Sequence, residues 1–215
     1  MVLSDNSNLW LADELWRLGS IEFGEYTLGR TAVGSPIYLN VRKLIGHPNA
    51  LWRAAHVINE EITALQSMRH PQMDGFDLIA GVPLGGLHIA TTYSLLTKVP
   101  LIYLHPNHAE DDNKTPIEGV YTPGQQAIIM DDLVTGGGSI IETAERLREA
   151  GLLVKDAFVL VDRQQGARER LKAEGINLRA ALSLEVILNY LKSSGLIENS
   201  WYRRSMDYLD ASRKA

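Results

Sequence analysis

Residues 127–140 read AIIMDDLVTGGGSI. An apolar run that is typical of a buried strand ends in two adjacent acids, Asp131 and Asp132, and passes at once into three successive glycines. Successive glycines at the start of a helix are suited to holding an anion such as a phosphate. Neighbouring carboxylates repel each other, however, and a phosphate bound beside them would add to that repulsion. A ligand that suits this stretch therefore carries a phosphate together with neutral or cationic groups.

The composition is that of an ordinary globular protein. The chain has 215 residues, 45% of them hydrophobic, and a net charge of −5, which indicates one domain with at most a small appendage. The acidic balance argues against a nucleic-acid-binding surface, because such surfaces have a basic excess. The sequence has no cysteine, so disulfides, zinc-thiolate sites and thiol nucleophiles are excluded.

Two observations bear on location. The first residues, MVLSDNSNLW, contain no basic segment followed by an apolar run, so they do not resemble a secretory signal. No apolar stretch approaches the roughly 20 residues that a membrane span needs. We therefore expect a soluble, cytoplasmic protein.

Strand and helix patterns alternate from residue 76 onward. Strands are expected at residues 76–82, 99–104, 117–121, 126–132, 155–162 and 177–183. Helical patterns lie between or after them, at residues 84–98, 138–151, 166–175 and 184–195. This alternation predicts an α/β fold with a parallel sheet, and the continuous apolar runs are typical of strands that are covered on both faces. Before residue 76 we expect a helix, two short strands and a long helix, packed across one end of the sheet.

The residues after strand 126–132 are suited to a phosphate monoester. Ligands of open parallel sheets bind beyond the carboxyl ends of the strands, where backbone amides of a glycine run converge and a helix amino terminus adds partial positive charge. A ribose 5-phosphate unit fits, with its phosphate in the loop and its hydroxyls on Asp131 and Asp132. A glycine turn alone also occurs for packing reasons, and no P-loop lysine is present, which argues against Walker-type hydrolysis. The phosphate-binding candidates are Thr135, Gly136, Gly137, Gly138 and Ser139.

This stretch resembles the type I phosphoribosyltransferases, whose motif is a hydrophobic strand, two acids and a Thr/Gly/Ser loop. The likeness reaches from about Leu9 to Leu196 and is to the orotate phosphoribosyltransferases, including the orotate domain of uridine monophosphate synthases. It is carried by FGEYTL (23–28), SPIYLNVR (35–42), IAGVPLGG (79–86), PLIYL (100–104), IEGVYTPG (117–124) and VLVDRQQGARERL (159–171).

The resemblance implies the type I phosphoribosyltransferase fold and its reaction. Residues 76–195 would form the phosphoribosyl-binding core, residues 1–75 a hood over the base pocket, and residues 196–215 a carboxyl-terminal helix and tail. Orotate would react with phosphoribosyl diphosphate to give orotidine monophosphate and diphosphate. Mg²⁺ would be required, held by the ligand's phosphates and ribose rather than by a firm protein ligand, and the protein would be a homodimer.

The resemblance also implies roles for single residues. Asp131 and Asp132 would be the catalytic pair that holds the ribose hydroxyls. Arg163 would meet the orotate carboxylate, because an arginine fork matches a planar carboxylate with two hydrogen bonds. The alternative for Arg163 is a surface ion pair with Asp162 or Glu169.

The base pocket would be lined by the stretch that begins at Ser35 and ends at Tyr38. Tyr38 fits an ordinary core position equally well.

The loop between strands 99–104 and 117–121 departs from the family pattern. His105 and Pro106 stand in place of an Arg-Lys pair, and Ala109 stands in place of a catalytic lysine. Histidines here would either carry part of the charge that neutralises diphosphate or be ordinary solvated side chains. A metal site from His105, His108 and Asp111 matches no strong ligand spacing. The candidate loop residues are His105, His108 and Lys114.

Two further departures concern the same chemistry. Leu84 and Gly85 stand where a tyrosine and often a lysine are usual, and Gly29, followed by Arg30, stands where a lysine is typical. Losing one pre-placed charged group costs about 10²–10³ in rate. The sequence therefore leaves two alternatives beside an active orotate enzyme. One is an impaired or non-enzymatic homologue that binds phosphoribosyl diphosphate or nucleotides, and the other is a transferase for a different base.

Overall fold

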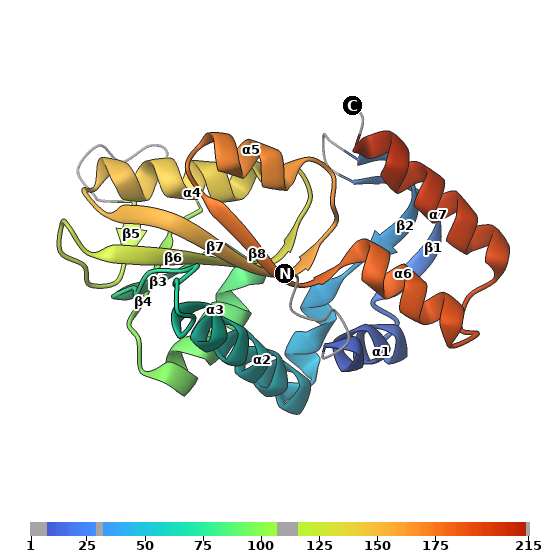
Figure 1. Ribbon diagram of the computed structural model, residues 1–215, viewed down its shortest axis with the longest axis horizontal. Coiled ribbons are helices and arrows are strands. Elements are labelled where there is room, and N and C mark those ends of the chain that lie inside the picture. Colours follow the sequence, from blue (N-terminus) through green and yellow to red (C-terminus); the bar gives the residue numbers. More distant parts are fainter. Residues whose placement is uncertain (1–7, 29–31, 107–115, 214–215) are drawn as a thin grey trace.

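The computed structural model describes residues 8–28, 32–106 and 116–213. Its centre is a six-stranded sheet in the order β5-β4-β3-β6-β7-β8 (Figure 1). All neighbouring strands run parallel except β5, which is antiparallel to β4. The strands are β3 Leu78–Gly81, β4 Leu101–Leu104, β5 Ile117–Glu118, β6 Gln126–Val134, β7 Leu153–Asp162 and β8 Asn177–Ser183. The predicted α/β class with a mostly parallel sheet is confirmed.

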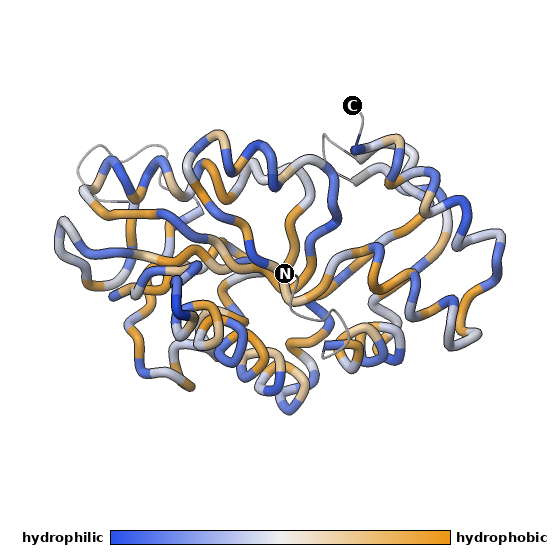
Figure 2. The backbone as a smooth tube through the Cα atoms, in the orientation of Figure 1, coloured by the Kyte–Doolittle hydropathy of each residue, from blue (hydrophilic) through white to orange (hydrophobic). Residues whose placement is uncertain are grey.

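Helices cover both faces of this sheet. The helices α2 and α3 lie on one face, and α4 and α5 lie on the other (Figure 1). Successive strand residues point to opposite faces, so Ile128 and Met130 of β6 belong to one core and Ile129 to the other. Figure 2 shows apolar stretches in the central strands, and hydrophobic and hydrophilic stretches that alternate along the helices on both faces. The bounds are α2 Pro48–Gln66, α3 Gly85–Thr97, α4 Gly138–Glu149 and α5 Ala167–Ala173.

The elements before α2 stand beside the sheet and are called the hood below, although a hood of residues 1–75 over a base pocket stays a prediction. Its antiparallel hairpin of β1 and β2 forms a separate two-stranded sheet. Its elements are α1 Leu9–Arg17, β1 Ile21–Leu28, β2 Ala32–Leu39 and the 3₁₀ helix η1 Val41–Gly46. The last two helices, α6 Leu184–Ser193 and α7 Asn199–Ser212, lie at the same end of the molecule (Figure 1).

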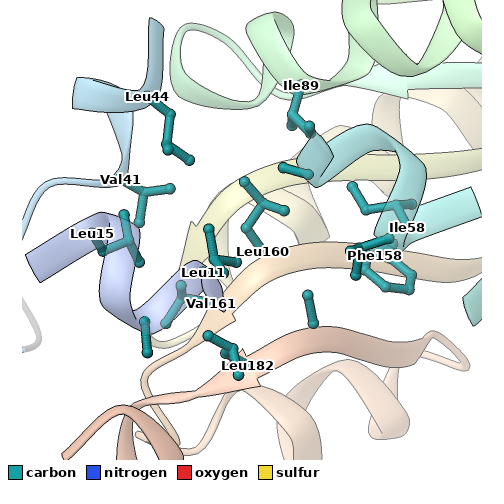
Figure 3. Packing of buried hydrophobic residues seen from close by; sticks show 14 of the residues in the cluster. Leu11, Leu15, Val41, Leu44, Ile58, Ile89, Phe158, Leu160, Val161 and Leu182 are labelled. Carbon is teal, nitrogen blue, oxygen red and sulfur yellow. The ribbon is translucent and has the colours of Figure 1, made fainter. Parts of the chain in front are cut away.

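The hood and the sheet share one hydrophobic core. Side chains of α1, η1, α2 and α3 meet those of β7 and β8 in a single cluster (Figure 3). This common burial fixes the hood on the sheet, since separating them would return that apolar surface to water. The labelled members are Leu11, Leu15, Val41, Leu44, Ile58, Ile89, Phe158, Leu160, Val161 and Leu182.

The carboxyl-terminal helix α7 packs on the hood hairpin. The rings of Trp201 and Phe23 lie with centroids 5.7 Å apart, and Arg204 pairs with Glu25 at 2.8 Å. The segment that the sequence predicts as an end helix therefore contacts the first strands of the chain. The predicted domain boundaries at 75/76 and 195/196 stay predictions.

Among the differences from the predicted elements are the ends of two strands. The strand expected at 117–121 is only Ile117–Glu118, because Gly119 turns the backbone with φ +109. Residues 35–41, SPIYLNV, predict a strand that reaches Val41, but β2 ends at Leu39 and the chain continues into the 3₁₀ helix η1. Within the described ranges, no helix has both the length and the apolar character that a membrane crossing requires.

Candidate active site

A cavity of about 380 Å³ opens at the carboxyl end of β6. Its lining includes Asp131, the whole predicted phosphate loop from Thr135 to Ser139, and Arg170 of α5. The structure therefore brings all five phosphate-binding candidates to one concave surface, at the carboxyl ends of the strands where the sequence places them.

The loop geometry explains why glycines are needed there. Gly137 has φ +79, a left-handed conformation that side chains rarely adopt, and α4 begins at the next residue. A Cβ on Gly137 would lie 3.3 Å from Leu171, so α5 packs directly behind the loop. No side chain caps the amino terminus of α4. Its first-turn amides have no intrahelical partner and can donate to an anion.

The two acids take different positions. Asp131 is buried and lines the cavity, whereas Asp132 is half-buried and lies against Gly85 at the start of α3. Asp132 donates its backbone amide to Oδ1 of Asp131 at 2.8 Å. Burial raises the pKa of the Asp131 carboxyl well above its ordinary value, and the negative charge of Asp132 adds to the rise.

The first turn of α3 lies tightly against both acids. A Cβ on Gly85 would fall 2.3 Å from Oδ1 of Asp132, and a Cβ on Gly86 would fall 2.5 Å from the carbonyl oxygen of Met130. Gly85, which departs from the family pattern, is thus in contact with a catalytic candidate. Its neighbour Leu84 is 66% exposed.

Arg163 follows directly on β7 and is only 1% exposed. Its Nε donates to Oε1 of Gln165 at 2.9 Å, and its Nη2 donates to Oγ of Ser35 at 3.0 Å and to the carbonyl oxygen of Ile37 at 3.4 Å. Burial lowers the pKa of the Arg163 guanidinium. The surface ion pair considered from sequence is wrong, because the side chain is buried and Asp162 pairs instead with Arg168 at 3.2 Å.

All these acceptors of Arg163 are neutral. Within the described ranges no carboxylate forms an ion pair with Arg163, and the charge is enclosed by a hydroxyl, a carbonyl and an amide. An isolated buried charge is costly unless it is paired. An anionic group beside Arg163 would compensate this charge, but Arg163 is not among the residues that line the cavity.

The two predicted base-pocket residues, Ser35 and Tyr38, differ in burial and in their contacts. Ser35 is fully buried and contacts Arg163 directly. Tyr38 is half-buried, and its ring lies 5.5 Å from the ring of Tyr26 at a tilt of 33°. The structure brings Ser35 and Arg163 together, and leaves the role of Tyr38 a prediction.

The loop candidates are mostly outside the described residues. His105 is exposed at the end of β4, and its amide donates to the carbonyl of Pro116 at 2.8 Å. His108 and Lys114, and the metal site considered with Asp111, lie outside the described residues. Among the residues that are described, no three His, Cys, Asp or Glu side chains are grouped to hold a metal ion.

Sequence reasoning missed Arg170. Among the described residues, it is the one cationic side chain in the lining of the cavity, and its Nη1 donates to the carbonyl of Gly136 at 2.6 Å. Its position depends on how α5 packs behind the glycine loop, and the sequence carries no local signal for that packing.

A parallel sheet with a glycine loop and paired acids at one edge defines an α/β protein that binds a phosphorylated sugar. Comparison with known proteins agrees. The phosphoribosyl transferase domain family matches residues 55–177. An orotate phosphoribosyltransferase from Cenarchaeum symbiosum is 36% identical over 190 residues, which are 86% of this chain and 90% of that protein.

Structural comparison gives the same result. The UMP synthase of Leishmania donovani matches with a TM-score of 0.83 and 32% identity, over 96% of this chain and 43% of that one. The orotate phosphoribosyltransferase of Aeropyrum pernix matches with a TM-score of 0.70 and 28% identity, over 85% of this chain and 99% of that one. The chain belongs to the phosphoribosyltransferase family, among the orotate phosphoribosyltransferases.

Proposed function

We propose that the protein transfers the phosphoribosyl group of phosphoribosyl diphosphate to orotate, giving orotidine monophosphate and diphosphate. One observation carries the proposal. An anion cradle and an uncompensated buried cation lie at the ends of adjacent strands, where the amide of Arg163 donates to the carbonyl of Val134 at 3.0 Å. The substrates of this reaction bring one phosphate and one carboxylate to such a pair. The orotate phosphoribosyltransferases among the relatives support this choice of base.

The 5-phosphate is bound by the cavity between β6 and α4. The first-turn amides of α4 donate to its oxygens, and the helix dipole favours its charge. The hydroxyls of Thr135 and Ser139 line the same cavity and can add hydrogen bonds. A phosphate in this place anchors the sugar next to Asp131.

The two acids act on the ribose. Their oxygens accept hydrogen bonds from the sugar hydroxyls and stabilise the positive charge that develops on C1 as its bond to diphosphate breaks. A bond then forms between C1 and N1 of orotate, and the proton of N1 is released. The high pKa of Asp131 in the free protein is offset when donors and cations of the bound substrate surround the carboxylate.

The base is selected by Arg163. Moving a guanidinium out of water costs several kcal/mol, and its neutral protein partners offset only part of that. The carboxylate of orotate supplies the missing charge. A base without an anionic group leaves this cation uncompensated and is expected to bind weakly.

The donor set at the site fits Mg²⁺, because carboxylate, phosphate and hydroxyl oxygens are the ligands it prefers. We assign the ion mainly to oxygens of the diphosphate and ribose, beside Asp131 and Asp132. When bound, it neutralises charge on the departing diphosphate.

A second candidate function is binding without turnover. It is favoured by residues 105–114, HPNHAEDDNK, which hold three acids and one lysine where the resemblance implies several cations. In that case the cradle and Arg163 still bind substrates and nucleotide, but diphosphate departs slowly or not at all.

The test is to mix purified protein with orotate, phosphoribosyl diphosphate and Mg²⁺ and to follow the formation of orotidine monophosphate. Asp132→Asn serves as the inactive control, and uracil, which lacks the carboxylate, serves as the base control. We expect turnover with orotate and none with uracil. Binding of both substrates by calorimetry without turnover would favour the second candidate, and no binding at all would exclude both.

Two further properties belong to the proposal. We assign a homodimer, which sedimentation equilibrium would test by a mass of twice 23.9 kDa. We assign the cytoplasm as the location, which cell fractionation would test. A sequence without cysteine is compatible with a reducing compartment.

A further inference from the structure

The surroundings of Arg163 contain a second polar residue with two distinct partners. The amide of Gln165 accepts a hydrogen bond from Nε of Arg163 at 2.9 Å through its oxygen. Through its nitrogen it donates to the hydroxyls of Tyr208 at 3.1 Å and Ser212 at 3.4 Å, both on α7. The amide therefore bridges the buried guanidinium and the carboxyl-terminal helix.

The helix that supplies these partners is itself held in place. The hydroxyl of Ser212 donates to the carbonyl of Tyr208 at 2.9 Å. Arg213 pairs with Glu185 of α6 at 2.6 Å, and Glu185 in turn accepts from the side chain of Gln164 at 3.5 Å. The turn after β7 is thus tied to α6 through Gln164 and to α7 through Gln165.

The orientation of the amide has a chemical consequence. A glutamine side chain presents an acceptor at one end and donors at the other, and only its oxygen can face a guanidinium. Because a guanidinium can only donate, the amide oxygen is directed to Arg163, and the amide nitrogen is left to the hydroxyls on α7. A glutamate in this place would also accept from Arg163, but it would neutralise the cation that the base requires.

We propose that Gln165, tied to α7 by its hydrogen bond with Tyr208, is a specificity-determining residue that positions Arg163 while leaving its charge available to an anionic base. This rests on the proposed function, because it assigns Arg163 to the carboxylate of the base. It adds a role for the carboxyl-terminal helix, which reaches the base side of the site through one hydrogen-bonded amide.

The test uses Gln165→Glu and two probes that need no turnover. Orotidine monophosphate contains the base carboxylate, and ribose 5-phosphate lacks it. Glutamate keeps the acceptor for Arg163, and the hydroxyl of Tyr208 can rotate to donate to it, so the fold is preserved. We expect calorimetry to show a loss on the order of ten- to a hundredfold in affinity for orotidine monophosphate, with affinity for ribose 5-phosphate unchanged.

Gln125→Glu is the matched control. The side-chain oxygen of Gln125 accepts from the amide of Thr122 at 2.7 Å, so glutamate again keeps the acceptor and adds the same charge, here just before β6 at the opposite edge of the sheet. We expect it to bind both probes as the wild type does. Tyr208→Phe removes one partner of the amide nitrogen. We expect it to lower the affinity for orotidine monophosphate by a smaller factor and to leave the affinity for ribose 5-phosphate unchanged.

The outcomes separate the two proposals. If Gln165→Glu binds orotidine monophosphate as tightly as the wild type, the role of Gln165 is wrong and the proposed function stands. If both probes weaken equally, Gln165 is only structural and the inference is again wrong. If the wild type binds neither probe, the proposed function itself fails.

Discussion

Replacing Gly86 by alanine sets two physical effects against each other. Gly86 lies in the first turn of α3, where helix propensity alone predicts that alanine stabilises by about 1 kcal/mol. The added Cβ, however, would fall 2.5 Å from the carbonyl oxygen of Met130 and 2.7 Å from Cα of Asp131. Relaxed contacts of this kind need about 3.5 Å, so α3 must retreat by roughly 1 Å.

The steric effect is expected to dominate. Both obstructing atoms are backbone atoms of β6, which is hydrogen-bonded on each side to β3 and β7 and cannot yield. Overpacking of this kind costs up to about 3 kcal/mol, so Gly86→Ala loses a net of about 2 kcal/mol. For a chain of this size that is a fall of roughly 4–8 °C in Tm.

Catalysis should suffer more than stability, because the retreat also displaces the backbone around Asp131. A misplacement of about 1 Å costs on the order of 10²-fold in rate. Thermal denaturation and kcat/KM for phosphoribosyl diphosphate measure the two effects. Gly75→Ala is the control, since its Cβ would meet nothing within 4 Å. A Gly86→Ala protein that is as stable and as active as the wild type would refute the claim that α3 packs too closely on β6 to admit a Cβ at this position.

Three other predictions follow from the site. The folded-state pKa of Asp131 lies above its unfolded value, so the wild type loses stability as pH rises through that interval. Asp131→Asn should therefore be more stable than the wild type in urea unfolding at neutral pH. This advantage should shrink toward acid pH. A constant difference in stability at all pH values would contradict the raised pKa of Asp131. Arg170→Gln should weaken ribose 5-phosphate about fivefold, as expected for an exposed charge, and calorimetry in rising salt should erase the difference. Arg146→Gln, at the other end of α4, should have no effect, and an equal loss in both variants would contradict a local role for Arg170. Chelation of Mg²⁺ should abolish turnover and leave Tm unchanged, because no described cluster of ligands holds the ion within the protein; a lower Tm after chelation would instead indicate a structural ion.

The sequence by itself determined the features that depend on neighbours along the chain. Alternating strand and helix patterns predicted the parallel sheet, because apolar periodicity is set by local backbone geometry and burial. The order of strand, acids and glycines predicted the phosphate cradle, since a loop between a strand and the next helix is held by the residues that flank it. Thr135 to Ser139 accordingly lie where they were expected.

Only the tertiary structure decided which distant groups meet. Arg163 contacts Ser35 across 128 positions and, through Gln165, reaches Tyr208 another 43 positions away. The structure also placed Asp131 at the cavity and against Gly86, and Asp132 against Gly85. Such contacts are set by how the hood, α5 and α7 pack on the sheet. Many pairings of distant segments satisfy the same local pattern, and the choice among them depends on shared burial and on the hydrogen bonds that each packing completes.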